Sequence, residues 1–166
     1  MSPLDDVLLS AARLQELVPD AVLVGGNAAA LHAHHRDSFD HDHVVRDLEH
    51  RFGAILDALE SDPDWVVNRA TPGKIILGEL GGIEAGVRQM IRTVPLEVEE
   101  VQLTNGATVR VPGPDSVASQ VMRQLSAPRP RDSRTTAQLT SYKGLRAPWT
   151  DWSHVADQCR AIADKM

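Results

Sequence analysis

The feature that most constrains the fold is a short apolar run that ends in two glycines. Residues 21–24 are apolar, Gly25-Gly26 follows, and an alanine-rich segment over 28–35 comes next. An apolar run closed by turn residues predicts a buried strand, and the alanine-rich segment predicts a helix. Residues 38–45 alternate in character and predict a second strand. We therefore expect the order strand, glycine turn, helix, strand.

Two aspartates, Asp40 and Asp42, lie two positions apart in the second predicted strand. Because successive strand side chains point to opposite faces, both carboxylates are expected on one face. Carboxylates held side by side repel each other unless a cation lies between them, and Mg²⁺ prefers oxygen ligands of this kind. The free N–H groups of the helix that follows Gly25-Gly26 favour an anion. The sequence thus predicts neighbouring metal and phosphate sites, as phosphoryl transfer requires.

The rest of the chain predicts an α/β (α+β) fold, with a mixed β-sheet and flanking helices. Amphipathic helices are expected over 3–17 and from 48 to about 61. Strands are expected over 65–67, 74–77, 83–91, 96–103 and 108–111, with a hairpin turn at Asn105-Gly106. Later helices are expected over 115–125, 133–142 and 150–165. We expect one domain over 1–166, with a core over 20–112 and a C-terminal helical segment over 113–166.

Composition limits the compartment and the kinds of partner. No apolar run approaches the ~20 residues that span a bilayer, the N-terminus lacks the pattern of a signal peptide, and Cys159 is the single cysteine. A cytoplasmic protein with no membrane partner, disulfide or cysteine-based zinc site is expected. The net charge of −6 argues against indiscriminate nucleic-acid binding.

A basic segment lies in the C-terminal third of the chain. Its cations, set against Asp132 alone, are Arg123, Arg129, Arg131, Arg134, Lys143 and Arg146. Such a segment facing an acidic site suits a metal-bound phosphate ligand or an RNA end. A solvated helix face is the alternative interpretation.

The combination of Gly25-Gly26 with Asp40-x-Asp42 resembles the signature of the DNA polymerase β-like nucleotidyltransferase superfamily. The spacing of Arg36, Ser38 and the two aspartates is most similar to the AbiEii-type nucleotidyltransferases, toxins of bacterial toxin–antitoxin pairs that include the MenT group. The resemblance implies a nucleotidyltransferase-type sheet and Mg²⁺ or Mn²⁺ bound by the aspartates. It also implies transfer of a nucleoside monophosphate from an NTP to an RNA (tRNA) or protein hydroxyl, with an antitoxin as a protein partner.

The resemblance also implies a set of site residues. Members usually carry a third carboxylate on a following strand, for which Glu84 is the first candidate and Glu97 or Glu99 the reserve. The catalytic residues are then Asp40, Asp42 and Glu84. The residues expected to bind nucleotide are Gly25, Gly26, Asn27, Arg36, Ser38, Arg123 and Lys143. For Ser38, a structural role at the start of the strand is the alternative.

The C-terminal third departs from the family pattern. Relatives carry a lysine in the helix after the last strand, where this chain has Gln120 and Val121, with Arg123 nearby. An arginine supplies charge but does not exchange a proton. A nucleotide-binding protein of the same fold with weak or no turnover is therefore the alternative function. His41 and His43 alternate with the aspartates and point to the opposite face, so we expect them to be packing or surface residues rather than zinc ligands.

Overall fold

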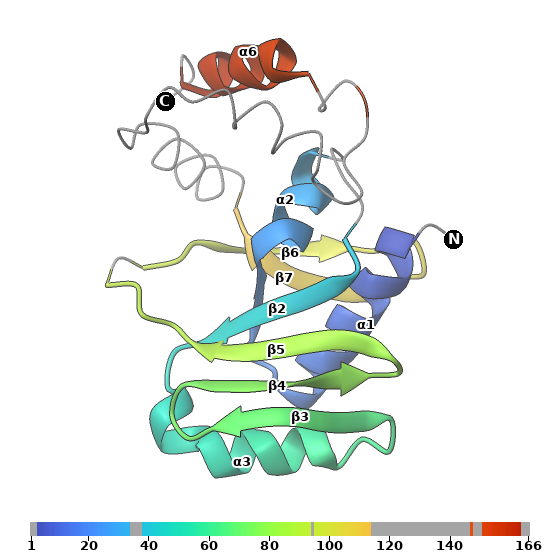
Figure 1. Cartoon of the computed structure of the whole chain (residues 1–166), viewed down its shortest axis with the longest axis vertical. Helices are drawn as coiled ribbons and strands as arrows, with labels where there is room; N and C mark the ends of the chain where they lie inside the picture. The colour runs from blue at the N-terminus through green and yellow to red at the C-terminus, as the bar shows by residue number, and fades with distance from the viewer. Residues whose placement is uncertain (1–2, 34–37, 94, 114–146, 148–150, 164–166) are drawn as a thin grey trace.

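The computed structural model describes residues 3–33, 38–93, 95–113, 147 and 151–163. Figure 1 shows the elements in chain order, coloured from the N-terminus to the C-terminus. The helices are α1 (Pro3–Leu17), α2 (Gly25–Ala33), α3 (Leu48–Glu60) and α6 (Trp152–Ala163). The strands are β1 (Val22–Val24), β2 (Asp40–Val45), β3 (Trp65–Thr71), β4 (Ile75–Leu80), β5 (Ile83–Gln89), β6 (Val98–Gln102) and β7 (Thr108–Pro112).

The central sheet has five strands in the order β1-β2-β5-β4-β3. β2 and β5 run parallel, whereas the other neighbouring pairs are antiparallel. Parallel neighbours need a long crossover, and here it runs through α3, β3 and β4. The mixed sheet with flanking helices confirms the predicted fold class. The predicted order of strand, glycine turn, helix and strand is also confirmed: the first two strands are neighbours, and α2 packs against both.

One face of the sheet packs against α1 and α3. The buried apolar side chains of this core are Leu14, Val18, Ala21, Val45, Leu48, Ile55, Leu59, Trp65, Ile76, Leu80, Ala85 and Val87. Fully burying one large aliphatic side chain contributes roughly 1.5–3 kcal/mol, so this face holds the sheet to the helices. The opposite face of β2 and β5 carries polar side chains.

The hairpin of β6 and β7 forms a separate two-stranded sheet. It packs against α1, β1 and α2 through a second cluster: Leu4, Leu8, Ala11, Leu23, Ala28, Ala30, Val109 and Val111. Gln15 of α1, which is buried, joins the helix to β7. Its Nε2 donates to the Arg110 carbonyl at 2.9 Å, and its Oε1 accepts from the Arg110 N–H at 2.7 Å.

Several predicted boundaries differ from the structure. The helix after β1 begins at Gly25 rather than at residue 28, because Gly25 adopts φ 75° and turns the chain at once. Glu97 precedes β6 and Glu99 lies within it, so the reserve carboxylates belong to the hairpin rather than to the central sheet. The hairpin turn at Asn105-Gly106 is confirmed, with Gly106 at φ 88°.

At the C-terminus, α6 lies within the predicted helix over 150–165. The helices predicted over 115–125 and 133–142 fall outside the described residues. Among the helices that the structure describes, none combines the length and the apolarity needed to cross a membrane.

Candidate active site on the open face of the central sheet

β2 alternates between the open face of the sheet and the core. Asp40 is exposed and Asp42 partly exposed, whereas His41 and His43 are 1% and 0% exposed. This alternation confirms the prediction that the two aspartates share one face and the two histidines the other. The open face of the sheet therefore carries both carboxylates.

The two histidines belong to the packing beneath the site. Their rings lie edge to face with centroids 5.2 Å apart, and His41 Nε2 lies 3.0 Å from Ser10 Oγ. Burial lowers the pKa of His41 to about 4, and burial also holds the pKa of His43 well below its usual value. Both imidazoles are therefore neutral at pH 7. Within the described residues, no group of three or more His, Cys, Asp or Glu side chains lies close enough together to hold a metal ion.

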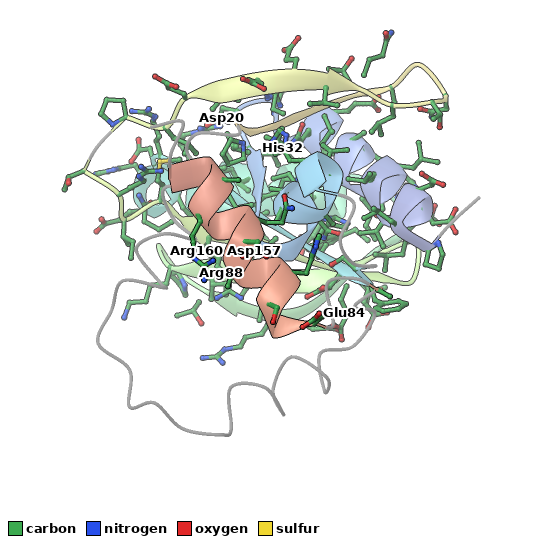
Figure 2. The ribbon with its side chains drawn as sticks, turned by 90° about the horizontal axis from the view of Figure 1, so that it is seen from above. Asp20, His32, Glu84, Arg88, Asp157 and Arg160 are labelled. Atoms are coloured by element: carbon green, nitrogen blue, oxygen red, sulfur yellow. The ribbon has the colours of Figure 1, made fainter. Side chains whose placement is uncertain are left out.

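Glu84 lies beside Asp40 on the neighbouring parallel strand. The register of β2 and β5 pairs Asp40 with Glu84 and Asp42 with Gly86, and paired residues of neighbouring strands point to the same face. Glu84 is exposed, as Asp40 is. Figure 2 shows Glu84 and Arg88 apart along β5, on the side of the sheet away from α1. A third carboxylate is thus brought next to the predicted pair.

Gly86 leaves room for the Asp42 carboxylate. A Cβ at position 86 would lie 2.6 Å from Asp42 Oδ1 and 3.1 Å from a methyl group of Leu77. The backbone of Gly86 does not need a positive φ, so the requirement is for space alone. A glycine inside a strand often marks such a close approach. Gly86 therefore belongs to the site, although the sequence interpretation did not include it among the site residues.

Arg88 contributes a positive charge to the candidate site, and the sequence analysis did not include it among the site residues. Its Nε lies 3.4 Å from Asp42 Oδ1, and about half of its side chain is exposed. β5 is held against the end of β2 by Gln89, whose Nε2 donates to the Arg46 carbonyl at 2.6 Å. Gln89 Oε1 also accepts from the Leu48 N–H at 2.8 Å, so it caps α3. The end of β5 is thus fixed against the turn that follows β2.

The start of α2 lies at the same end of β2 as Asp40. β1 pairs with β2 antiparallel as far as Val24, which is opposite Asp42. Gly25 then begins α2, so the free N–H groups at the helix start lie next to the carboxylates. The amide Nδ2 of Asn27 donates to the backbone carbonyl of Asp40. The Asn27 side chain thus bonds to the protein at a position where the sequence interpretation had assigned it to the nucleotide.

Ser38 is buried next to Asp40, and its Oγ lies 3.4 Å from Asp40 Oδ1 and 3.4 Å from the Asp40 carbonyl oxygen. This arrangement agrees with a structural role and leaves its predicted nucleotide contact a prediction. Arg36, Arg123 and Lys143 lie outside the described residues, and so do Gln120 and Val121.

The residues present fit a divalent cation of the Mg²⁺ type. Mg²⁺ is commonly held by one or two carboxylates, with the remaining positions taken by water and substrate phosphates. Asp40 and Asp42 supply two carboxylates on an accessible face, and Gly86 keeps the space beside Asp42 clear. Closed, all-protein coordination is not needed for such an ion.

No known family profile matches this sequence, and no curated protein matches it. The solved structures with a similar fold include two with TM-scores of at least 0.50. One is ANT(2″)-Ia in complex with adenylyl-2″-tobramycin, with 15% identity and a TM-score of 0.53 over 97% of this chain and 95% of that one. The other is TM1012 of Thermotoga maritima, a protein assigned as a nucleotidyltransferase, with 16% identity and a TM-score of 0.50 over 72% of this chain and 84% of that one. The fold of this chain is therefore that of the nucleotidyltransferases.

Proposed function

We propose that this protein is a metal-dependent nucleotidyltransferase, which transfers a nucleoside monophosphate from an NTP to a hydroxyl group. The observation that carries the proposal is the register of β2 and β5, which sets Asp40 beside Glu84 on the open face. Asp42 lies two residues further along, opposite Gly86. Three carboxylates on neighbouring parallel strands, next to a glycine-started helix, match the needs of phosphoryl transfer.

In the proposed reaction the acceptor oxygen attacks the α-phosphorus of the NTP. A new oxygen–phosphorus bond forms, the bond to the bridging α–β oxygen breaks, and pyrophosphate leaves. Asp40 and Asp42 would hold the Mg²⁺ or Mn²⁺ ion, which would neutralise charge on the phosphate oxygens. Glu84 would accept the proton of the acceptor hydroxyl.

The remaining predicted residues receive roles in nucleotide binding under this proposal. Gly25 and Gly26 let the backbone approach the phosphates at the start of α2. Arg36, Arg123 and Lys143 supply positive charge to the triphosphate, and Ser38 supports Asp40. Removal of one such electrostatic contact typically lowers a rate by about a hundredfold or more.

The acceptor that we propose is RNA, with tRNA as the specific candidate and a protein hydroxyl as the other. Two arginines of the open face, which lie among its carboxylates, support contacts with RNA phosphates. Register pairing places Arg69 of β3 on the same face as Leu77, Gly86 and Asp42, and Arg88 lies next to Asp42. We further propose that the protein is the toxin of a bacterial toxin–antitoxin pair.

The proposal is tested by incubating the protein with Mg²⁺ and each α-³²P-labelled NTP, with total RNA, total protein or tobramycin as acceptor. We expect label in RNA, loss of transfer in Asp40→Asn and Asp42→Asn, and retained NTP binding without transfer in Glu84→Gln. Growth arrest on expression, relieved by Asp42→Asn, is expected if the protein is a toxin. Absence of both metal binding and transfer in the parent protein would contradict the proposal.

The alternative is a nucleotide-binding protein without turnover, and the absence of a lysine at positions 120 and 121 favours it. This alternative predicts MgNTP binding with no transfer to any acceptor. A large gain of transfer in Gln120→Lys or Val121→Lys would indicate that a family lysine has been lost. Rapid transfer by the parent protein, and by Arg123→Ala and Lys143→Ala, would instead rule the alternative out.

A further inference from the structure

β1 is too short to pair with the start of β2. Its last residue, Val24, lies opposite Asp42, and Gly25 then turns the chain into α2. Continued antiparallel pairing would set position 26 opposite Asp40, but that position already belongs to the helix. Asp40, the first residue of β2 and one of the two proposed metal ligands, therefore has no partner on β1.

Asn27 supplies the missing hydrogen bond. Its Nδ2 donates to the Asp40 carbonyl, which is the group that a longer β1 would have bonded. The side chain is only 2% exposed, so it is fixed between α2 and β2 rather than free to move into a ligand site. A side-chain amide thus extends the pairing of the sheet by one residue at the metal site.

The oxygen of the Asn27 side-chain amide is not suited to binding a phosphate. Asn27 Oδ1 is buried and has no hydrogen-bond partner among the described residues. Anionic phosphate oxygens accept hydrogen bonds and do not donate them, so they offer nothing to a carbonyl oxygen. Swapping the amide oxygen and nitrogen would set two acceptors, Oδ1 and the Asp40 carbonyl, against each other. The orientation of the amide is therefore fixed by Asp40.

We infer that Asn27 is a positioning residue, which holds Asp40 in place for the metal rather than binding the nucleotide phosphates. This inference rests on the proposed function only in that Asp40 and Asp42 bind a divalent cation. Groups that orient a metal ligand are worth about 10–100-fold in metal affinity. Loss of the Asn27 amide frees the Asp40 backbone and weakens metal binding before any nucleotide arrives.

The experiment measures Mn²⁺ alone and MgATP in separate calorimetric titrations. The variants are Asn27→Ala, which removes the amide, and Asn27→Thr, which retains a shorter donor. Asn68→Ala is the matched control, because Asn68 donates to Glu79 Oε1 at 3.3 Å on an exposed part of β3 and β4. Circular dichroism identifies a temperature at which each protein is fully folded.

We expect Asn27→Ala to raise the Kd for Mn²⁺ about tenfold or more, Asn27→Thr to fall between it and the parent, and Asn68→Ala to match the parent. If Asn27 instead bound the phosphates, Asn27→Ala would raise the Kd for MgATP and leave the Kd for Mn²⁺ unchanged. That result would overturn the inference. If Asn27→Ala does not fold, Mn²⁺ binding by Asn27→Thr equal to that of the parent overturns it. A parent that binds no Mn²⁺ overturns the proposed function as well, whereas a binding parent with unaffected variants overturns this inference alone.

Discussion

Gly86 lies opposite Asp42 across the parallel pair of β2 and β5, and a Cβ at position 86 would come within 2.6 Å of Asp42 Oδ1. The Asp42 carboxylate of β2 thus lies against the backbone of Gly86 on β5. The space for the Asp42 carboxylate on β2 is thus set by the residue that β5 places beside it. The geometry of the proposed site depends on the absence of a side chain at position 86 as much as on the presence of one at position 42.

Gly86→Ala is expected to displace the Asp42 carboxylate and to raise the metal Kd about tenfold or more. The strand itself should remain, because alanine meets no backbone restriction at this position. Gly53→Ala is the control, since a Cβ there meets nothing within 4 Å on α3. That change should leave metal binding unaltered and stabilise the protein by up to about 1 kcal/mol. Equal metal affinity in both variants would contradict the role of Gly86 in leaving space for the Asp42 carboxylate.

Arg88→Gln is expected to strengthen the binding of Mn²⁺ alone, because the guanidinium competes with the ion for Asp42 Oδ1 at 3.4 Å. An exposed ion pair is worth about 0.2–1 kcal/mol, so the Kd should fall by a factor of roughly 1.5 to 5. Arg160→Gln is the control, because it removes an exposed ion pair with Asp157 on α6 and the same unit of charge. Calorimetry without nucleotide makes the comparison. Weaker Mn²⁺ binding by Arg88→Gln would mean that Arg88 supports the metal site.

The buried histidines predict that the protein loses stability in acid. The folded pKa of His41 is about 4 against 6.5 in the unfolded chain, and that of His43 is also lowered. Between these values only the unfolded chain takes up the proton, so the free energy of unfolding falls as the pH drops from 6.5 towards 4. One such histidine accounts for a loss of about 3 kcal/mol over this interval.

Urea unfolding above pH 6.5 and at steps down to about pH 4 tests this dependence. His43→Leu should flatten the profile. His50→Gln is the control: His50 is exposed, and its pKa is raised by a hydrogen bond to Asp47, so its protonation favours the folded state as the pH falls. A profile that His43→Leu leaves as steep as before would mean that other groups govern acid unfolding.

Gln15→Leu is expected to destabilise the contact between α1 and the β6–β7 hairpin. The change removes both partners of the Arg110 backbone, leaving an N–H and a carbonyl unpaired. Each buried unpaired group costs about 1–3 kcal/mol. Glu16→Leu alters the next, exposed residue of the same helix and should change the free energy of unfolding by less than about 0.5 kcal/mol. Urea unfolding that does not separate the two variants would contradict the role of Gln15.

The sequence predicted the local parts of the site well. Alternation along β2 was enough to place Asp40 and Asp42 on one face and His41 and His43 on the other, because strand geometry has a period of two. The glycine turn and the helix after β1 were also predicted, although the helix begins at Gly25. These features depend on neighbours in the chain.

What the sequence could not supply was the pairing between distant segments. Nothing in residues 83–89 states that β5 runs parallel to β2 with Glu84 beside Asp40. The strand-interior Gly86 was a signal of close approach that could have been used. The bond from Asn27 to Asp40 could not have been foreseen, because it depends on β1 ending one residue pair short. The roles of Glu84 and the nucleotide-binding residues stay predictions.

The in-and-out order of β2 makes the strand intolerant of insertions and deletions. A single residue added or lost within Asp40–Val45 would reverse the alternation of side chains on one side of the change. A carboxylate would then turn toward the apolar core, and an imidazole would face the solvent on the open face. Such a change would disrupt both the pair of carboxylates on the open face and the packing of the core. Homologues should therefore vary in length on either side of this strand, but not within it.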